Sequence, residues 1–109
     1  MIAQVSQHQP AIAVLCRRYG VVRLDLFGSA ATGRFDGSRS DLDFVAEFDQ
    51  VEPTAAYADR FLDFAGSLEL LFGRKVDVVS ESALRHSRLA TAIAASRETV
   101  YAEPRSVAV

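Results

Sequence analysis

The feature that most constrains the fold is a segment in which two short alternating stretches are separated by a polar turn that contains glycine. It runs from Leu24 to Phe48 and reads LDLFGSAATGRFDGSRSDLDFVAEF. Apolar and polar residues alternate over 21–27 and again over 41–48, the period of a half-buried strand. The segment therefore predicts two strands that bury one face of a sheet.

Helical spacing and helix-ending residues predict the elements on either side. Apolar residues three and four apart indicate a helix that ends at Gly20, and a second helix between a capping Thr54 and a stop at Gly73. We expect a third strand over 75–79 and a last helix from Ser80, with Leu84, Leu89, Ile93 and Val100 on its apolar side. The order predicts an α/β (α+β) layer with helices on one face of a short sheet and the other face free for a ligand.

Composition narrows the function classes. The 109 residues are predicted to form one domain, 1–109, and half of them are apolar. The net charge of -2 argues against a binder of nucleic acid that uses a basic surface. The single cysteine, Cys16, allows no internal disulfide, and no apolar run or leader pattern indicates a membrane span or a signal peptide. We expect a cytoplasmic protein without membrane contact.

Three acidic residues are the candidate catalytic and metal-binding residues. Asp41 and Asp43 are two apart on a predicted strand, so their side chains share a face with Cα atoms roughly 6.5–7 Å apart. Asp77 interrupts the apolar run KVDVV, where an unpaired charge would be costly. Alone, an Asp-x-Asp pair is more often a solvent-facing strand feature. Three acids in this order behind a Gly-Ser turn favour a magnesium site for phosphoryl or nucleotidyl transfer.

The turn supplies the candidate nucleotide-binding residues. Gly28 allows close approach of a phosphate to the backbone, and Ser29 offers a hydroxyl and N–H groups to an anion. Taken alone, this pair would be an ordinary turn between a strand and a helix. Ser40 either hydrogen-bonds beside the acidic strand or ends the loop. Lys75 shares a strand face with Asp77 and either reaches a triphosphate or is solvated, as most charged groups are.

At these residues the chain resembles the minimal nucleotidyltransferases of the DNA polymerase beta superfamily. Their hallmark is a Gly-Ser pair, about ten residues, an Asp-x-Asp and a third Asp on a later strand; here ten residues, 30–39, separate the two elements. The match continues through LFGRKVDVV and covers about 21–101. The combined pattern is specific, whereas each piece alone is weak.

The resemblance implies a mixed sheet, with helices on one side and the site on the other. It implies two magnesium ions held by Asp41, Asp43 and Asp77, and a triphosphate held by Gly28 and Ser29. Asp77 would help to deprotonate a hydroxyl that attacks the α-phosphorus of a nucleoside triphosphate, ATP by resemblance, with release of pyrophosphate.

One part of the family pattern is missing. Many members carry an arginine just before the second glycine of the Gly-Ser turn, or two residues before it. This chain has Ala-Ala-Thr at 30–32, ahead of Gly33. Arg34 and Arg39 are the candidates to supply that positive charge.

The small size also bears on the acceptor. The smallest family members lack the extra domain with which relatives grip an acceptor, and many are encoded beside a HEPN-domain toxin. The resemblance thus implies an antitoxin that transfers AMP to a tyrosine of that toxin, as a hetero- or homo-oligomer without direct nucleic-acid binding. Two alternatives stay open: an antitoxin with weak or no catalysis that acts by binding, and nucleotidyl transfer to a small molecule or an RNA end.

Overall fold

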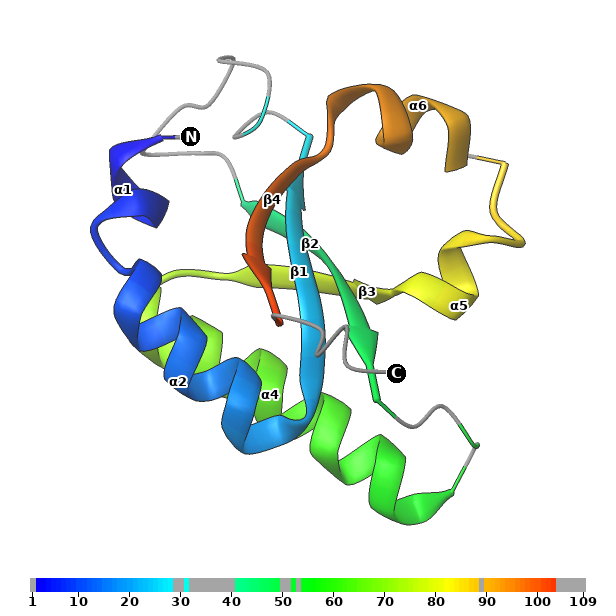
Figure 1. Cartoon of the computed structure of the whole chain (residues 1–109), viewed down its shortest axis with the longest axis horizontal. Coiled ribbons are helices and arrows are strands. Elements are labelled where there is room, and N and C mark those ends of the chain that lie inside the picture. The colour runs from blue at the N-terminus through cyan, green and yellow to red at the C-terminus, as the bar shows by residue number, and fades with distance from the viewer. Residues whose placement is uncertain are drawn as a thin grey trace, which may run out of the picture.

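The alternating segments form a mixed sheet (Figure 1). The computed structural model describes residues 2–28, 31, 41–49, 52, 54–88 and 90–103. Over these ranges the sheet has four strands in the order β3-β2-β1-β4, with β2 and β3 parallel and the other neighbours antiparallel. The strands are β1 Val21–Phe27, β2 Leu42–Phe48, β3 Val76–Ser80 and β4 Glu98–Ala102. The mixed sheet that the resemblance implied is confirmed.

The two long helices lie together on one face of this sheet (Figure 1). They are α2 Gln9–Tyr19 and α4 Ala55–Phe72. Their predicted ends are confirmed: Gly20 and Gly73 both adopt left-handed backbone, and the Thr54 side chain accepts a hydrogen bond from the backbone N–H of Tyr57. The first helix was predicted from about Ser6, but α2 begins at Gln9, and a separate short helix, α1 Ala3–Ser6, precedes it.

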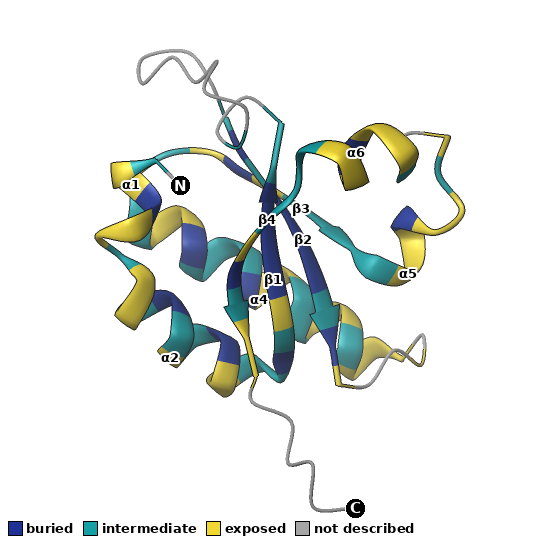
Figure 2. Cartoon of the chain, turned by 45° about the horizontal axis from the view of Figure 1, so that its top comes forward, coloured by how far each residue is buried: buried dark blue, intermediate teal, exposed yellow. Residues whose placement is uncertain are grey.

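The main core fills the space between these helices and the sheet (Figure 2). The apolar side of β2 faces it, as the alternation predicted, and Phe44 packs there with Phe64 and Leu68 of α4. Cys16 of α2 is fully buried in the same core. Burial raises the pKa of the Cys16 thiol to about 12, which makes it a packing residue and not a nucleophile.

A second, smaller apolar cluster lies on the opposite face. Val45 packs there against Leu84 of α5, Glu81–Leu84, and Ile93 of α6, Ala90–Ser96. Val45 belongs to the acidic side of β2, so its burial requires a cover on that side. The face expected to be free for a ligand is therefore partly covered by α5 and α6, and the open part lies beside this cover.

The prediction of the last helix is wrong for its C-terminal part. Helix α6 ends at Ser96, and Val100 lies in β4, where Tyr101 pairs with Leu24 of β1. Leu89 lies outside the described residues. The run from Thr99 to Tyr101 is β-branched and aromatic, a composition that favours strands. The pairing partner is far away in the sequence, and helical periodicity carries no information about it.

No helix in the described part of the chain is long and apolar enough to cross a membrane.

The core should depend strongly on Phe64. Its side chain is fully buried, so we expect Phe64→Ala to lower the free energy of unfolding by about 3–5 kcal/mol, measured by urea denaturation. Leu62, on the same helix, is 66% exposed and provides the control: Leu62→Ala should change stability by less than about 0.5 kcal/mol. Equal losses for the two variants would contradict this core.

Candidate active site

Two of the three predicted acids come together where β2 and β3 run side by side. The parallel register places Asp43 directly beside Asp77, whose negative charge acts on Asp43. Both point to the face opposite the main core, since Leu42 and Phe44 on either side of Asp43 are buried in that core. The site is thus built by the pairing of two strands that are separated in the sequence by the whole of α4.

The environment of this pair strongly disfavours a second negative charge. Burial raises the pKa of Asp43 to about 6, and the charge of Asp77, the hydrogen bond to Asp77 and the charge of Asp41 add to the effect. Lys75 acts in the opposite direction. At neutral pH the positive charge near the two adjacent carboxylates is therefore too small to balance them. Their hard oxygen donors suit magnesium. On this chemistry, Asp43 and Asp77 fit a divalent cation.

Asp41 lies at the margin of the pair, linked to it by a lysine. The Lys75 Nζ atom is 3.8 Å from Oδ2 of Asp41 and 3.9 Å from Oδ1 of Asp77. All three side chains are substantially exposed, so these contacts contribute little stability. Within the described ranges no group of three His, Cys, Asp or Glu side chains has the arrangement of a metal site. The structure therefore brings together Asp43 and Asp77, with Asp41 nearby and Lys75 as a shared counter-charge.

The side chain of Asp77 is accessible and not buried. Its side chain is 49% exposed, although Val76 before it is buried. The sequence argument that an unpaired charge would be costly in this apolar run does not hold, because β3 is an edge strand and Asp77 points to its open face. The exposure leaves this carboxylate within reach of a second molecule.

The glycine of the predicted phosphate turn lies against the acid pair. Phe27, at the end of β1, is the cross-strand partner of Asp43, and Gly28 follows it with φ of +72°. A Cβ atom on Gly28 would stand 2.8 Å from Oδ2 of Asp43. Only glycine combines this backbone conformation with so close an approach.

The other predicted residues of the turn lie outside the described residues. They are the nucleotide-binding candidates Ser29 and Ser40, the turn positions Thr32 and Gly33, and the candidate arginines Arg34 and Arg39. Their assignments stay predictions.

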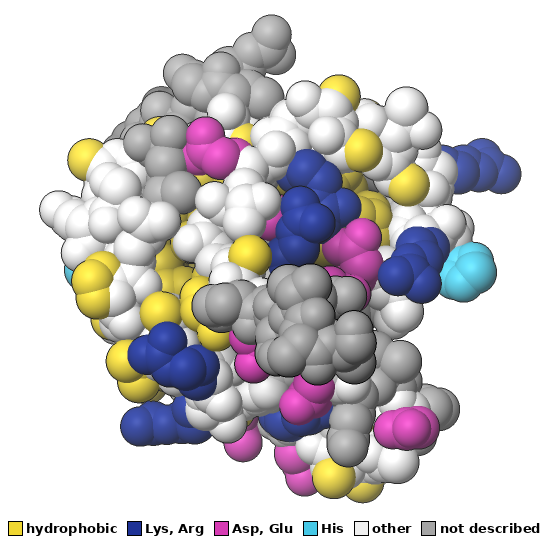
Figure 3. All heavy atoms as spheres, in the orientation of Figure 1, with side chains coloured by type: hydrophobic (Ala, Val, Ile, Leu, Met, Phe, Trp, Pro, Cys, Tyr) yellow, Lys and Arg dark blue, Asp and Glu magenta, His cyan; other side chains and the backbone are white. Residues whose placement is uncertain are grey.

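Sequence reasoning missed a group of charged residues on the same face. Asp25 was expected simply on the polar side of β1, but its side chain is completely buried and bonded to Arg23 and Arg97. Figure 3 shows basic and acidic side chains side by side in the region between β4 and α5. The aspartate within the apolar run LDLF could have indicated a buried charge, but its partner Arg97 is 72 residues away in the sequence.

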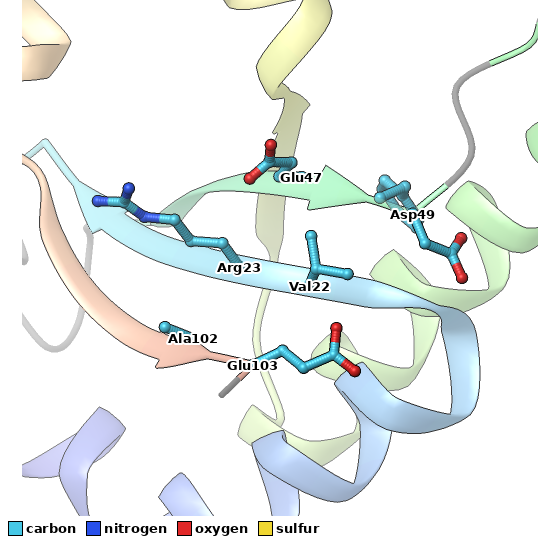
Figure 4. A pocket seen from close by; sticks show the side chains of 7 residues that line it. Val22, Arg23, Glu47, Asp49, Ala102 and Glu103 are labelled. Carbon is cyan, nitrogen blue, oxygen red and sulfur yellow. The ribbon is translucent and has the colours of Figure 1, made fainter. Parts of the chain in front are cut away.

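One hollow in the described surface lies away from the acid pair. It has a volume of about 580 Å³ and lies where β1 begins and β2 ends (Figure 4). Its lining includes Val22, Glu47, Asp49 and Glu103, and none of the predicted site residues. Strand direction places it at the opposite end of β1 from Gly28, so we do not assign the chemistry to it.

Comparison with known proteins finds a matching family model and a similar protein of known activity. The family model described as a nucleotidyltransferase domain matches residues 11–101. The protein adenylyltransferase MntA of Thermococcus cleftensis is 31% identical over 87 residues, which are 80% of each chain.

Solved structures show the same fold. One that is described as a minimal nucleotidyltransferase superposes with a TM-score of 0.69 at 31% identity, over 85% of this chain and 89% of the other. A chain from a complex of a tri-AMPylated Shewanella oneidensis HEPN toxin with an MNT antitoxin gives a TM-score of 0.53 at 16% identity, over 89% of this chain and 71% of the other.

Gly28 should be required for the site and not only for the turn. We expect Gly28→Ala to lose about 1–2 kcal/mol of stability through its left-handed backbone, and also to weaken Mn²⁺ binding by displacing Asp43. Gly73→Ala is the matched control, because Gly73 has φ of +65° and open space around an added Cβ. Calorimetric titration with Mn²⁺ should separate the two variants, and equal affinities would contradict the assignment.

The acid pair should make the metal-free protein less stable at neutral pH than at low pH. The pKa of Asp43 in the folded protein, about 6, exceeds that of an unfolded aspartate, about 3.9, so the folded state binds more protons between these values. This contribution to stability is present at low pH and disappears as pH rises through 6.

We therefore expect metal-free Asp43→Asn to be more stable than the parent at pH 7.5, with the difference shrinking toward pH 4, in thermal melts with a chelator. Asp59→Asn, on the exposed surface of α4, is the control. If the parent protein is at least as stable as Asp43→Asn at pH 7.5, the proposed destabilisation by the charged Asp43 carboxylate is refuted.

Proposed function

The chain belongs to the nucleotidyltransferase domain family, and we propose that it transfers AMP from ATP to a tyrosine hydroxyl of a partner HEPN-domain toxin, acting as its antitoxin. The observation that carries the proposal is the juxtaposition of Asp43 and Asp77 on an open sheet face, with Gly28 against them. Two carboxylates beside a glycine turn are what nucleotidyl transfer needs: ligands for a cation and a backbone that a phosphate can approach.

The cation would be magnesium, with Asp43 and Asp77 as its ligands and Asp41 as a further ligand after a small movement. Magnesium in such a site neutralises triphosphate charge and lowers the pKa of a bound hydroxyl. Two ions are proposed, as in the family resemblance. Lys75, already between Asp41 and Asp77, is free to turn toward the added phosphate charge because its side chain is 66% exposed.

The remaining steps fall to the chain's own groups. Gly28, and with it Ser29, would hold the phosphates beside the acids. The acceptor oxygen forms a bond to the α-phosphorus, while the bond from that phosphorus to the bridging oxygen breaks and pyrophosphate leaves. Asp77 would take the proton of the acceptor hydroxyl, a role that its exposed side chain permits.

A protein acceptor suits the position of the site. Asp77 lies on β3, the edge strand of the sheet, so a side chain presented by another protein can reach it without entering a deep cavity. A similar protein is named a protein adenylyltransferase, and a structurally similar chain is an antitoxin in complex with an AMPylated HEPN toxin. These likenesses support a HEPN-domain toxin as the partner and AMP as the transferred group.

The test is transfer of label from ATP labelled at the α-phosphate. With magnesium and a HEPN-domain toxin encoded beside the gene, we expect label on the toxin, and on the order of 100-fold less with Asp43→Asn or Asp77→Asn. Asp49→Asn, which removes a carboxylate beyond the far end of β2, should transfer normally.

Label that is absent, or independent of both acids, would overturn the proposal. A tight complex without label would instead favour an antitoxin that acts by binding.

A further inference from the structure

A cluster of ion pairs around the buried Asp25 lies beside the site and takes no part in the proposed chemistry. Arg97 is at its centre: its Nε is 2.6 Å from Oδ2 of Asp25, and its Nη2 is 2.7 Å from Oε2 of Glu81. A second contact to Glu81, 3.3 Å from Nη1 to Oε1, makes that pair bidentate. Arg23 approaches Asp25 from the other side, at 3.1 Å. We call these four residues the Arg97 cluster.

The Arg97 cluster occupies the row of side chains next to the acid pair. Across the sheet, Asp25 is the partner of Val45, and Val45 is the partner of Val79. Two residues along each strand, the next row on the same face is Phe27, Asp43 and Asp77. Adjacent rows are roughly 7 Å apart, so a shift of the first row is transmitted to the second.

Arg97 also connects three separate parts of the chain. Asp25 lies in β1, Glu81 is the first residue of α5, and Arg97 itself joins α6 to β4. Among the described residues, a small apolar cluster also packs α5 and α6 on the sheet, and two of the residues packed against it are Phe27 and Val79. Phe27 adjoins both Gly28 and Asp43, and Val79 lies two residues from Asp77.

The contacts are of the kind that hold a fixed geometry. The hydrogen bond to Glu81, and then those to Asp25, raise the pKa of Arg97 against the opposing effect of its burial. The Asp25 side chain is fully buried, so removal of Arg97 alone would leave a poorly compensated charge. A planar guanidinium with two carboxylate partners has a defined orientation that an ammonium group cannot reproduce.

We propose that Arg97 is a positioning residue for nucleotidyl transfer: through Asp25 and Glu81 it fixes α5 and α6 on Phe27 and Val79, and so sets the spacing of Gly28, Asp43 and Asp77. This inference rests on the proposed function. If it is correct, transfer requires Arg97 in addition to the three acids and the glycine turn.

The test uses the neutral pair Asp25→Asn/Arg97→Met, which removes one charge of each sign so that the fully buried side chain at position 25 carries no charge; Glu81 loses its arginine but is 22% exposed. Hydrophobic replacement of buried ion pairs is often tolerated, so we expect a folded protein with a melting temperature near that of the parent. Its kcat for labelled AMP transfer should fall roughly 10- to 100-fold, because small misplacements of reacting groups have effects of this size. Arg97→Lys, which keeps the charge, should recover only part of the rate.

The matched control removes another ion pair. Arg60 Nη1 is 2.9 Å from Oδ1 of Asp49 near the far end of β2, and Asp49→Asn/Arg60→Met should leave kcat unchanged. A folded neutral pair with kcat within twofold of the parent would overturn the positioning role and leave Arg97 purely structural. If the neutral pair does not fold, Arg97→Lys decides: full kcat overturns the role and a reduced kcat supports it.

A binding measurement separates this inference from the proposed function. If the parent transfers no AMP, the proposed function fails, and calorimetric binding of Mg²⁺ with a non-hydrolysable ATP analogue still tests the geometry. A folded neutral pair, or Arg97→Lys in its place, should then bind at least about fivefold more weakly than the parent. Equal affinity, or no binding by the parent, would overturn the inference.

Discussion

The parallel pairing of β2 with β3 places two like charges side by side, and much of the molecule is arranged around that contact. Asp43 and Asp77 occupy matching positions on neighbouring strands, where burial and mutual repulsion raise the pKa of Asp43 to about 6. Such a pair is unfavourable in the free protein and becomes favourable when a divalent cation is present. The chain thus keeps a local instability where its proposed chemistry needs a strong cation site.

The two faces of the sheet divide stability and function between them. On one face, α2 and α4 bury the large apolar residues that provide most of the core. On the other, the helices α5 and α6 cover the part over Val45, and among the described residues the acids lie beside that cover. The Arg97 cluster lies beside this cover, which is why ion pairs around the buried Asp25 can matter for a site that they do not contact.

Local patterns predicted most elements and the acids of the site. Alternation indicated the first two strands, a short apolar run indicated the third, and glycines and a threonine indicated the helix ends, because strand period and helix capping depend on neighbours in the sequence. The last strand and the Asp25–Arg97 pair were missed because each depends on a partner more than 70 residues away. Asp77 was recognised for an incorrect reason, since its side chain is exposed on an edge strand.

By itself, the sequence determined the fold class and singled out Gly28 and three candidate acids, since the spacing of side chains along a strand follows from backbone geometry alone. Only the tertiary structure decided that Asp43 pairs with Asp77 while Asp41 remains at the margin with Lys75. It also decided that Asp25 is buried against Arg97. Strand order and register are set by packing of the whole chain, so contacts between strands cannot be derived from the residues of either strand.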